Sequence, residues 1–167
     1  GQRTLEEACE KADLNPAAYL RQAARDVDAQ YSGRKAALLP LFDALLTHAS
    51  RLGDDVKVCP CKTIVPIYRA HVFAQIKAPA ATRVELGLSL RGEKATKRLL
   101  DTGGEAKGDR ITHAVRLSCL EEIDDQVLKL LRRAYERCAP AEEDRRGADK
   151  AARPGRKSSS RVRKRLG

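Results

Sequence analysis

The spacing of apolar residues changes twice along this chain, and this change limits the fold more than any other feature of the sequence. In residues 16–27 and 34–52 apolar residues recur every three or four positions, which predicts amphipathic helices. Between residues 56 and 117 the spacing is two, the side-chain period of a β-strand. Helical spacing returns over residues 118–137. The sequence therefore predicts an α+β fold, in which an antiparallel sheet of about five strands has helices on one face and follows a helical N-terminal extension.

Residues that start or stop regular structure set the expected boundaries. Pro16 favours the first turn of a helix, whereas Pro40 either starts the regular part of the next helix or kinks it. Gly53 is expected to end that helix in the left-handed conformation. Ser118 and Glu121 have the spacing of a capping box, which predicts the start of the last helix. Strands are expected over residues 56–59, 63–68, 72–77, 84–90 and 111–117, and a long polar loop with one helical turn near Lys97–Leu100 is expected over 91–110.

Charge is distributed unevenly along the chain. The net charge is +10, and residues 140–167 hold ten basic and four acidic residues with almost no large apolar ones. Such a segment cannot bury enough surface to offset its ordering entropy. We therefore expect three parts: a helical N-terminal extension over residues 1–30, the α+β domain over 31–139 and a disordered basic tail over 140–167. Methionine is absent even at position 1, which indicates a fragment of a longer protein.

The apolar runs and the cysteines of the sequence indicate the cellular compartment in which the protein is expected. No run of 18 apolar residues is present, and no apolar stretch follows a basic start, so neither a membrane span nor a signal peptide is predicted. The five cysteines are odd in number and scattered, which does not fit a disulfide framework. Reduced thiols are typical of a reducing compartment, so we predict a cytoplasmic protein.

Several short segments between residues 31 and 137 carry a resemblance to a known family. They are Lys35-Ala36-Ala37-Leu38 with Pro40, Asp43-Ala44-Leu45, Leu52-Gly53-Asp54-Asp55-Val56, Lys62-Thr63, Phe73-Ala74, Arg83-Val84-Glu85-Leu86-Gly87-Leu88, Ile111-Thr112-His113-Ala114-Val115-Arg116-Leu117 and Ala134-Tyr135. In their order these segments resemble a bacterial family described only as a domain of unknown function, numbered five-six-five-five. The resemblance implies the same α+β fold and no reaction. This chain differs from the family pattern at Cys61, where the resemblance implies a basic residue.

Motifs that carry chemistry were sought next. GxSxG, HExxH, the phosphate-binding P-loop and GxGxxG are all absent, which favours a protein that is not an enzyme, and no cofactor is expected. Cys59 and Cys61 are the weak candidates for a metal site, because their thiolates stand two residues apart. A closed zinc site needs four ligands, so two ordinary strand cysteines are favoured.

The outward positions of the expected strands supply a candidate surface for a ligand or partner. If residues 84–90 turn their apolar side chains toward the helices, alternate positions of the sheet face away, and that face is either solvated or covered by a protein partner. His113 alternates onto the apolar side, where a hydrogen-bonded buried histidine is favoured over a pocket acid or base. The candidate surface residues are Lys62, Thr63, Arg83, Thr112, His113 and Arg116.

The two ends of the chain offer two further candidates for nucleic-acid binding. Residues 5–12 and 16–27 favour a packed helical hairpin, with a DNA-reading helix-turn-helix as the alternative. In the tail, four cations can neutralise phosphates without regard to sequence, with an inert solubilising tail as the alternative. These tail residues are Arg161, Arg163, Lys164 and Arg165.

Together these features predict an uncharacterised, non-catalytic binding or accessory domain that binds nucleic acid weakly through its basic tail and does not contact a membrane. The alternative is a small-ligand binder or enzyme. Its pocket would lie near Lys62, Thr63, His113 and Arg116.

Overall fold

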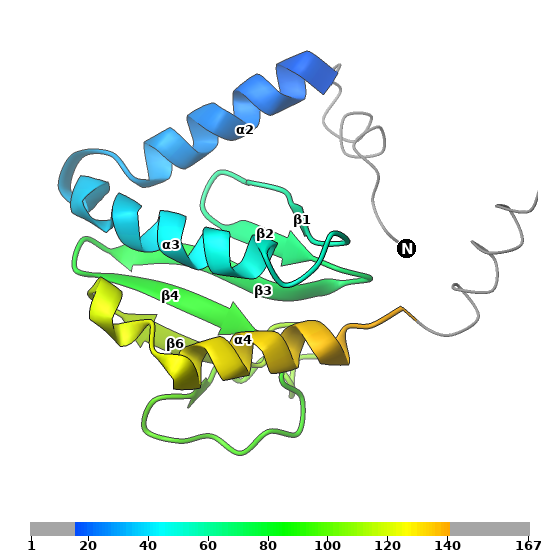
Figure 1. Ribbon diagram of the computed structural model, residues 1–167. Helices are drawn as coiled ribbons and strands as arrows, with labels where there is room; N and C mark the ends of the chain where they lie inside the picture. Colours follow the sequence, from blue (N-terminus) through cyan, green and yellow to red (C-terminus); the bar gives the residue numbers. More distant parts are fainter. Residues whose placement is uncertain (1–15, 141–167) are drawn as a thin grey trace, which may run out of the picture.

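The computed structural model describes the backbone of residues 16–140 and the side chains of residues 23–140. This part of the chain contains three α-helices, two short 3-10 helices and six strands, which confirms the α+β fold (Figure 1). The helices are α2 (Pro16–Gln30), η1 (Gly33–Leu38), α3 (Leu39–Ser50), η2 (Leu120–Glu122) and α4 (Asp125–Arg137). The strands are β1 (Lys57–Val58), β2 (Val65–Tyr68), β3 (Val72–Ala80), β4 (Arg83–Leu88), β5 (Leu100–Asp101) and β6 (His113–Leu117).

The six strands form one sheet in the order β1-β2-β3-β4-β6-β5, and every neighbouring pair is antiparallel. At the centre of the sheet Leu86 lies opposite Ile76 of β3 on one side and Val115 of β6 on the other. These three side chains point to the same face, because partners in an antiparallel register share a face. The alternation of apolar residues therefore predicted the buried face of the central strands correctly.

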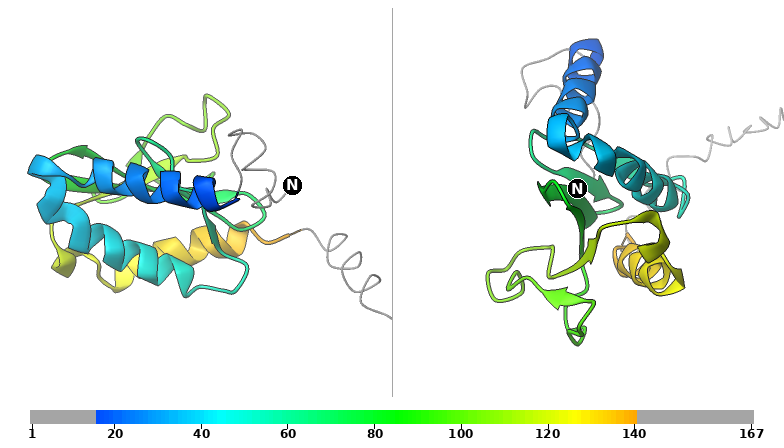
Figure 2. Two further views of the ribbon diagram at one scale, coloured as in Figure 1. Left: turned by 90° about the horizontal axis from the view of Figure 1, so that it is seen from above. Right: turned by 90° about the vertical axis from the view of Figure 1, so that its left-hand side faces the viewer.

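Helices α3 and α4 cover this buried face (Figure 2). The first part of the chain between β4 and β6 runs beside α4, where Arg133 and Arg137 contact Glu93. The later part, up to Ile111, lies against the other face of the sheet. The core between helices and sheet is mainly aliphatic: Leu45 of α3 and Leu86 and Leu88 of β4 are fully buried. Two aromatic pairs add to it. Phe73 meets Tyr135 edge to face with ring centroids 5.6 Å apart, and Tyr31 meets Phe42 at 4.6 Å.

The face of the sheet away from the helices is not fully open. The chain between β4 and β6 folds back toward it, and Leu100 of β5 pairs with Ala114 of β6. Ile111 lies over Gly87, where a Cβ atom would stand 2.8 Å from the Ile111 side chain. The expected helical turn near Lys97–Leu100 is therefore wrong: a short edge strand lies there because its backbone groups pair with β6.

Two expected helix boundaries are also wrong. Gly53 is not a left-handed cap, because α3 already ends at Ser50 and the next residue, Arg51, keeps a right-handed conformation. The last helix does not begin at the predicted capping box of Ser118 and Glu121. Asp124 is its N-cap, and the Asp124 carboxylate accepts a hydrogen bond of 3.1 Å from the Val127 N–H. Pro40 does lie in the first turn of α3, which matches the alternative in which it starts the helix.

Two predictions concern residues outside the described part of the chain. The first helix of the N-terminal hairpin, over residues 5–12, lies there, so the helix-turn-helix alternative stays a prediction. The tail residues Arg161, Arg163, Lys164 and Arg165 lie there too. Across the portion that the structure describes, none of the helices combines the length and the apolar character needed to traverse a bilayer.

Candidate functional site

The six residues predicted to form a ligand or partner surface do not come together. Lys62 and Thr63 are exposed in the loop before β2. Arg116 projects from the opposite face of the sheet to that covered by the helices, 3.8 Å from the Glu85 carboxylate. Arg83 opens β4 across from Ala80, and its Nε is buried with no hydrogen-bond partner in the described part of the chain.

Thr112 and His113, the other two, are buried, which for His113 agrees with the favoured interpretation of a hydrogen-bonded buried histidine. Thr112 is 1% exposed, which corrects its predicted outward position, and His113 is 3% exposed on the helix side. The Thr112 hydroxyl accepts from the Leu90 N–H at 3.0 Å and lies 2.8 Å from His113 Nδ1, while His113 Nε2 lies 2.9 Å from the Glu93 carbonyl oxygen. A carbonyl only accepts, so Nε2 carries the proton. Both ring nitrogens therefore have a hydrogen-bond partner, and this network links the loop after β4 to β6.

The two cysteines considered as metal ligands stand alone. Cys59 is half-buried and Cys61 is exposed, and neither they nor Cys119 and Cys138 form a disulfide among the described residues. Within residues 23–140 no three His, Cys, Asp or Glu side chains lie together in a way that could hold a metal ion. The structure therefore offers no metal centre on which to build a function for this part of the chain.

A groove between the end of α3 and the first half of α4 gathers cationic side chains that sequence analysis missed. It has a volume of about 260 Å³, with Leu52, Leu128 and Leu131 contributing apolar surface. Four of its lining residues are basic or imidazole side chains, and Asp125 is the one carboxylate among the lining residues. We call the three basic ones the groove cations: Arg51, Lys129 and Arg132.

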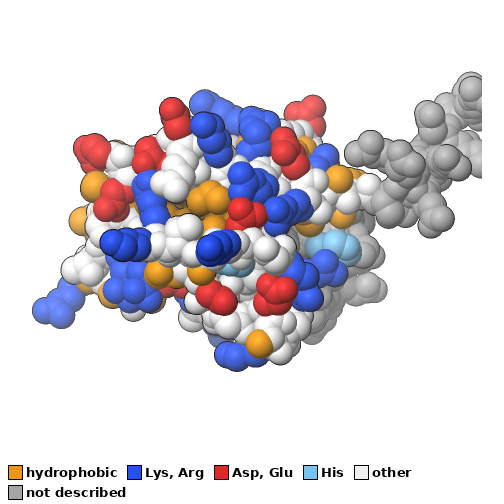
Figure 3. All heavy atoms as spheres, turned by 90° about the horizontal axis from the view of Figure 1, so that it is seen from below, with side chains coloured by type: hydrophobic (Ala, Val, Ile, Leu, Met, Phe, Trp, Pro, Cys, Tyr) orange, Lys and Arg blue, Asp and Glu red, His pale blue; other side chains and the backbone are white. Residues whose placement is uncertain are grey.

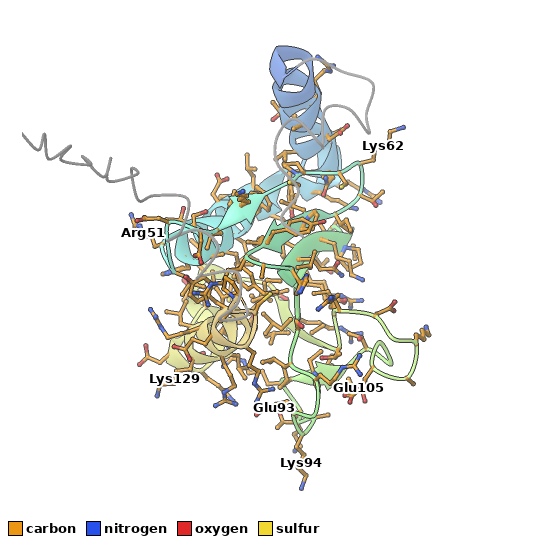
Figure 4. The ribbon with its side chains drawn as sticks, turned by 90° about the vertical axis from the view of Figure 1, so that its right-hand side faces the viewer. Arg51, Lys62, Glu93, Lys94, Glu105 and Lys129 are labelled. Carbon is orange, nitrogen blue, oxygen red and sulfur yellow. The ribbon has the colours of Figure 1, made fainter. Side chains whose placement is uncertain are left out.

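None of the groove cations has a carboxylate partner within 4.0 Å among the described side chains. Lys129 and Arg132 stand three residues apart on α4 and so share one side of the helix. Arg51 and Lys129 project on the same side of the molecule, from the end of α3 and from α4 (Figure 4). The groove therefore presents positive charge that no protein carboxylate neutralises directly.

The opposite flank of α4 differs, because its cations are paired. Arg133 and Arg137 contact the Glu93 carboxylate at 2.5 and 2.8 Å. Arg98 binds Asp124, and this hydrogen bond from Arg98 holds the pKa of the Asp124 carboxyl below its ordinary value. Seen from below, the molecule accordingly shows Lys and Arg side chains interspersed with Asp and Glu (Figure 3).

A cluster of Asp55, Arg69 and Tyr135 joins the last turn of α4 to the chain that follows α3. The Tyr135 hydroxyl of α4 donates to Asp55 Oδ1 at 2.7 Å, and Arg69 Nε donates to Asp55 Oδ2 at 2.7 Å. The Arg69 guanidinium also lies 4.0 Å from the centre of the Tyr135 ring. Burial raises the pKa of Asp55, but the hydrogen bonds from Arg69 and Tyr135 outweigh it, so the pKa lies below its ordinary value.

A larger cleft lies elsewhere and contains Lys62 and Thr63. It has a volume of about 730 Å³ and lies among the end of α2, the start of η1, the loop before β2 and the end of β3. Arg34, Lys35 and Lys77 also line it. The structure therefore brings two of the predicted site residues into one cleft and places the other four elsewhere.

Comparison with known families decides the family. A family model described as "Domain of unknown function (DUF5655)" matches residues 27–137, about two-thirds of the chain. The chain belongs to this family. The resemblance inferred from the sequence is thereby confirmed. Comparisons with curated proteins and with solved structures gave no match.

The DUF5655 match contains both the groove and the cleft, and the basic tail lies beyond it. The signal for the groove was partly present in the sequence, because Lys129 and Arg132 share the polar side of an amphipathic helix. That pattern is also typical of any solvated helix. What the sequence did not reveal is that Arg51, almost 80 residues earlier, lies across from them.

Proposed function

We propose that this DUF5655 domain is a non-catalytic nucleic-acid-binding module that holds the phosphate backbone along the groove between α3 and α4. The observation that carries the proposal is the set of three groove cations without carboxylate partners among the described residues. Arg and Lys side chains on a surface neutralise phosphates and release counterions, which supplies affinity without base recognition. Arg51 and Arg132 can also bind one phosphate through two parallel hydrogen bonds.

Two features of the groove oppose an anion and set the expected strength. Asp125 contributes a negative charge, and the carboxyl end of α3 carries the negative end of the helix dipole. We therefore expect weak, salt-dependent binding. The basic tail supports it, because the chain leaves α4 at Arg137 and residues 140–167 add ten basic residues to the same polypeptide.

The test is fluorescence anisotropy on the full chain with labelled single- and double-stranded oligonucleotides. The groove variant replaces Arg51, Lys129 and Arg132 with Gln, and a tail variant replaces Arg161, Arg163, Lys164 and Arg165 with Gln. A matched control replaces Arg91, Lys107 and Arg110 with Gln, because these exposed residues have the same charge and lie in the loop between β4 and β6.

We expect the groove variant to bind at least about tenfold more weakly than the control variant, because several phosphate contacts are lost. The tail variant should be weakened as well but should retain dependence on the groove. Equal affinities of the groove variant and the control would refute the groove as the site. Loss of all binding in the tail variant would leave only a nonspecific arm.

Two further expectations remain proposals. A cytoplasmic location is supported by the four cysteines of the described part, which form no disulfide there, and a bacterial origin stays an expectation from the resemblance. A protein partner on the sheet face away from the helices is supported by its mixed polar lining, which includes Gln75, Lys77 and Glu85. The alternative pocket of Lys62, Thr63, His113 and Arg116 has less support, since Lys62 and Thr63 line one cleft while both His113 ring nitrogens are hydrogen-bonded within the fold and Arg116 lies beside Glu85.

A further inference from the structure

The cleft beside α2 owes its shape to the different lengths of two paired strands. Strand β2 begins at Val65, which lies opposite Ile76, so β3 extends past it from Lys77 to Ala80 without a β2 partner. The loop of residues 61–64 turns away at this point. The end of α2 and the start of η1 close the other side and leave the space of about 730 Å³.

Hydrogen bonds hold the walls of this cleft in place. The Gln30 side chain of α2 donates to the Cys61 carbonyl oxygen at 2.5 Å and so joins the helix to the loop. Lys35 Nζ donates to the Ala78 carbonyl oxygen at 2.5 Å and joins η1 to β3. These two contacts link segments that are 31 and 43 residues apart in sequence. The cleft is therefore built from the fold rather than from one flexible loop.

The charged side chains that line the cleft are all positive. Its lining includes four cationic side chains and no Asp or Glu. Lys77 is paired with Glu85 at 3.1 Å, whereas Arg34 and Lys62 have no carboxylate within 4.0 Å among the described residues. Like charges gathered in a concave space repel one another, and a bound anion relieves that repulsion.

We propose that this cleft binds a small ligand that carries two or more linked phosphates, such as a nucleoside diphosphate. The cations stand on two sides, with Arg34 and Lys35 near η1 and Lys62 on the loop, so adjacent phosphates can be contacted from both. Thr63 adds an exposed hydroxyl donor. The volume falls within the roughly 300–1,000 Å³ of small-molecule pockets.

This site is independent of the proposed nucleic-acid groove. The two share no lining residue, and Lys62 lies beside α2, at the far end of the molecule from Arg51 and Lys129 (Figure 4). Failure of one proposal therefore leaves the other intact.

Isothermal titration calorimetry on the full chain, with inorganic pyrophosphate, ADP and orthophosphate at constant ionic strength, tests the proposal. A cleft variant with Arg34→Gln and Lys62→Gln is compared with a control with Arg91→Gln and Lys107→Gln, which are exposed and line neither the cleft nor the groove. We expect pyrophosphate and ADP to bind the wild type at least about tenfold more tightly than orthophosphate, and the cleft variant to lose this binding at least tenfold while the control keeps it.

Oligonucleotides with and without a 5′-phosphate distinguish a small ligand from a nucleic-acid end, because both offer the same chemistry. If only the phosphorylated oligonucleotide depends on Arg34 and Lys62, and pyrophosphate and ADP do not bind, the small-ligand proposal is overturned. It is overturned equally if pyrophosphate binds the cleft variant as tightly as the wild type. Circular dichroism of each variant confirms that it is folded.

Discussion

Removing the hydroxyl of Tyr135 tests the cluster that joins α4 to the chain after α3. In Tyr135→Phe, Asp55 loses a hydrogen bond of 2.7 Å from an uncharged donor to a charged acceptor. Hydrogen bonds to charged groups contribute about 1.5–3 kcal/mol. The Asp55 side chain keeps 35% of its surface exposed, so water replaces part of the loss. We therefore expect the free energy of unfolding to fall by about 1–2 kcal/mol.

The same hydroxyl explains why residue 53 is glycine. A Cβ atom on Gly53 would stand 2.1 Å from Tyr135 Oη, 2.8 Å from Asp55 Oδ1 and 3.0 Å from Tyr135 Cζ. Overpacking of this kind costs about 1–3 kcal/mol, so Gly53→Ala is expected to destabilise the native protein. In the Tyr135→Phe background the shortest contact is gone. The cost of Gly53→Ala should then fall by at least about 1 kcal/mol.

A double-mutant cycle measured by urea denaturation tests this coupling. Wild type, both single variants and the double variant are unfolded at pH 7, and their free energies are compared. Tyr31→Phe is the matched control, because the buried Tyr31 hydroxyl has no hydrogen-bond partner among the described residues and its loss should not destabilise the fold. If the two substitutions add within about 0.5 kcal/mol, the reasoning about the Gly53 contact is refuted.

Three other predictions follow from buried or paired polar groups. Because the folded pKa of Asp55 lies below its ordinary value, its ionised form stabilises the fold above about pH 4 and this contribution is lost as pH falls through the folded pKa. The difference in unfolding free energy between wild type and Asp55→Asn should therefore shrink below about pH 4 in acid titrations, and a difference that grows there would contradict it. Thr112→Val should lower the free energy of unfolding, measured by chemical denaturation, by about 1–3 kcal/mol, because it leaves the buried Leu90 N–H and a His113 ring nitrogen without a partner. An unchanged free energy would show that water replaces the hydroxyl. Glu93→Gln should lower the free energy of unfolding by less than about 1 kcal/mol, because its partners Arg133 and Arg137 are exposed side chains. A decrease above about 2 kcal/mol would mean that the loop after β4 depends on these two ion pairs.

The fold could be predicted where side-chain period and burial agree. The alternation of Val84, Leu86 and Leu88 indicated β4 because one face of that strand is fully buried. Pro40 indicated the start of α3 because its fixed φ angle and missing N–H suit a first helical turn. These are local effects, which a single stretch of sequence contains in full.

The missed features depend on residues far apart in the chain. Strand β5 has no alternation of its own and exists because Leu100 pairs with Ala114. Gly53 was interpreted as a helix cap, whereas the reason for glycine there is Tyr135, about 80 residues later. Thr112 looked outward by simple alternation, but the strand proper starts one residue later, at His113, and the hydroxyl turns inward to Leu90.

The candidate site was predicted only in part for the same reason. Lys62 and Thr63 do line a cleft, but their cationic neighbours Arg34 and Lys35 come from a different element that the sequence does not place beside them. The groove cations were not considered, because basic residues on the polar side of a helix are common. Only the packing of α3 beside α4 turns them into one surface.

The salt dependence of nucleic-acid affinity tests most directly whether the folded domain itself contacts phosphates. It is best measured on the full chain with the four tail cations replaced by Gln, with and without the three groove substitutions. Log affinity falls linearly as log salt concentration rises, and each phosphate contact with double-stranded DNA adds roughly 0.9 to the magnitude of this slope. We expect the chain with an intact groove to retain a slope of about 2–3 and the groove substitutions to reduce it by about that amount. A slope near zero with the groove intact, or an equal slope with and without the groove substitutions, would contradict binding by the folded domain.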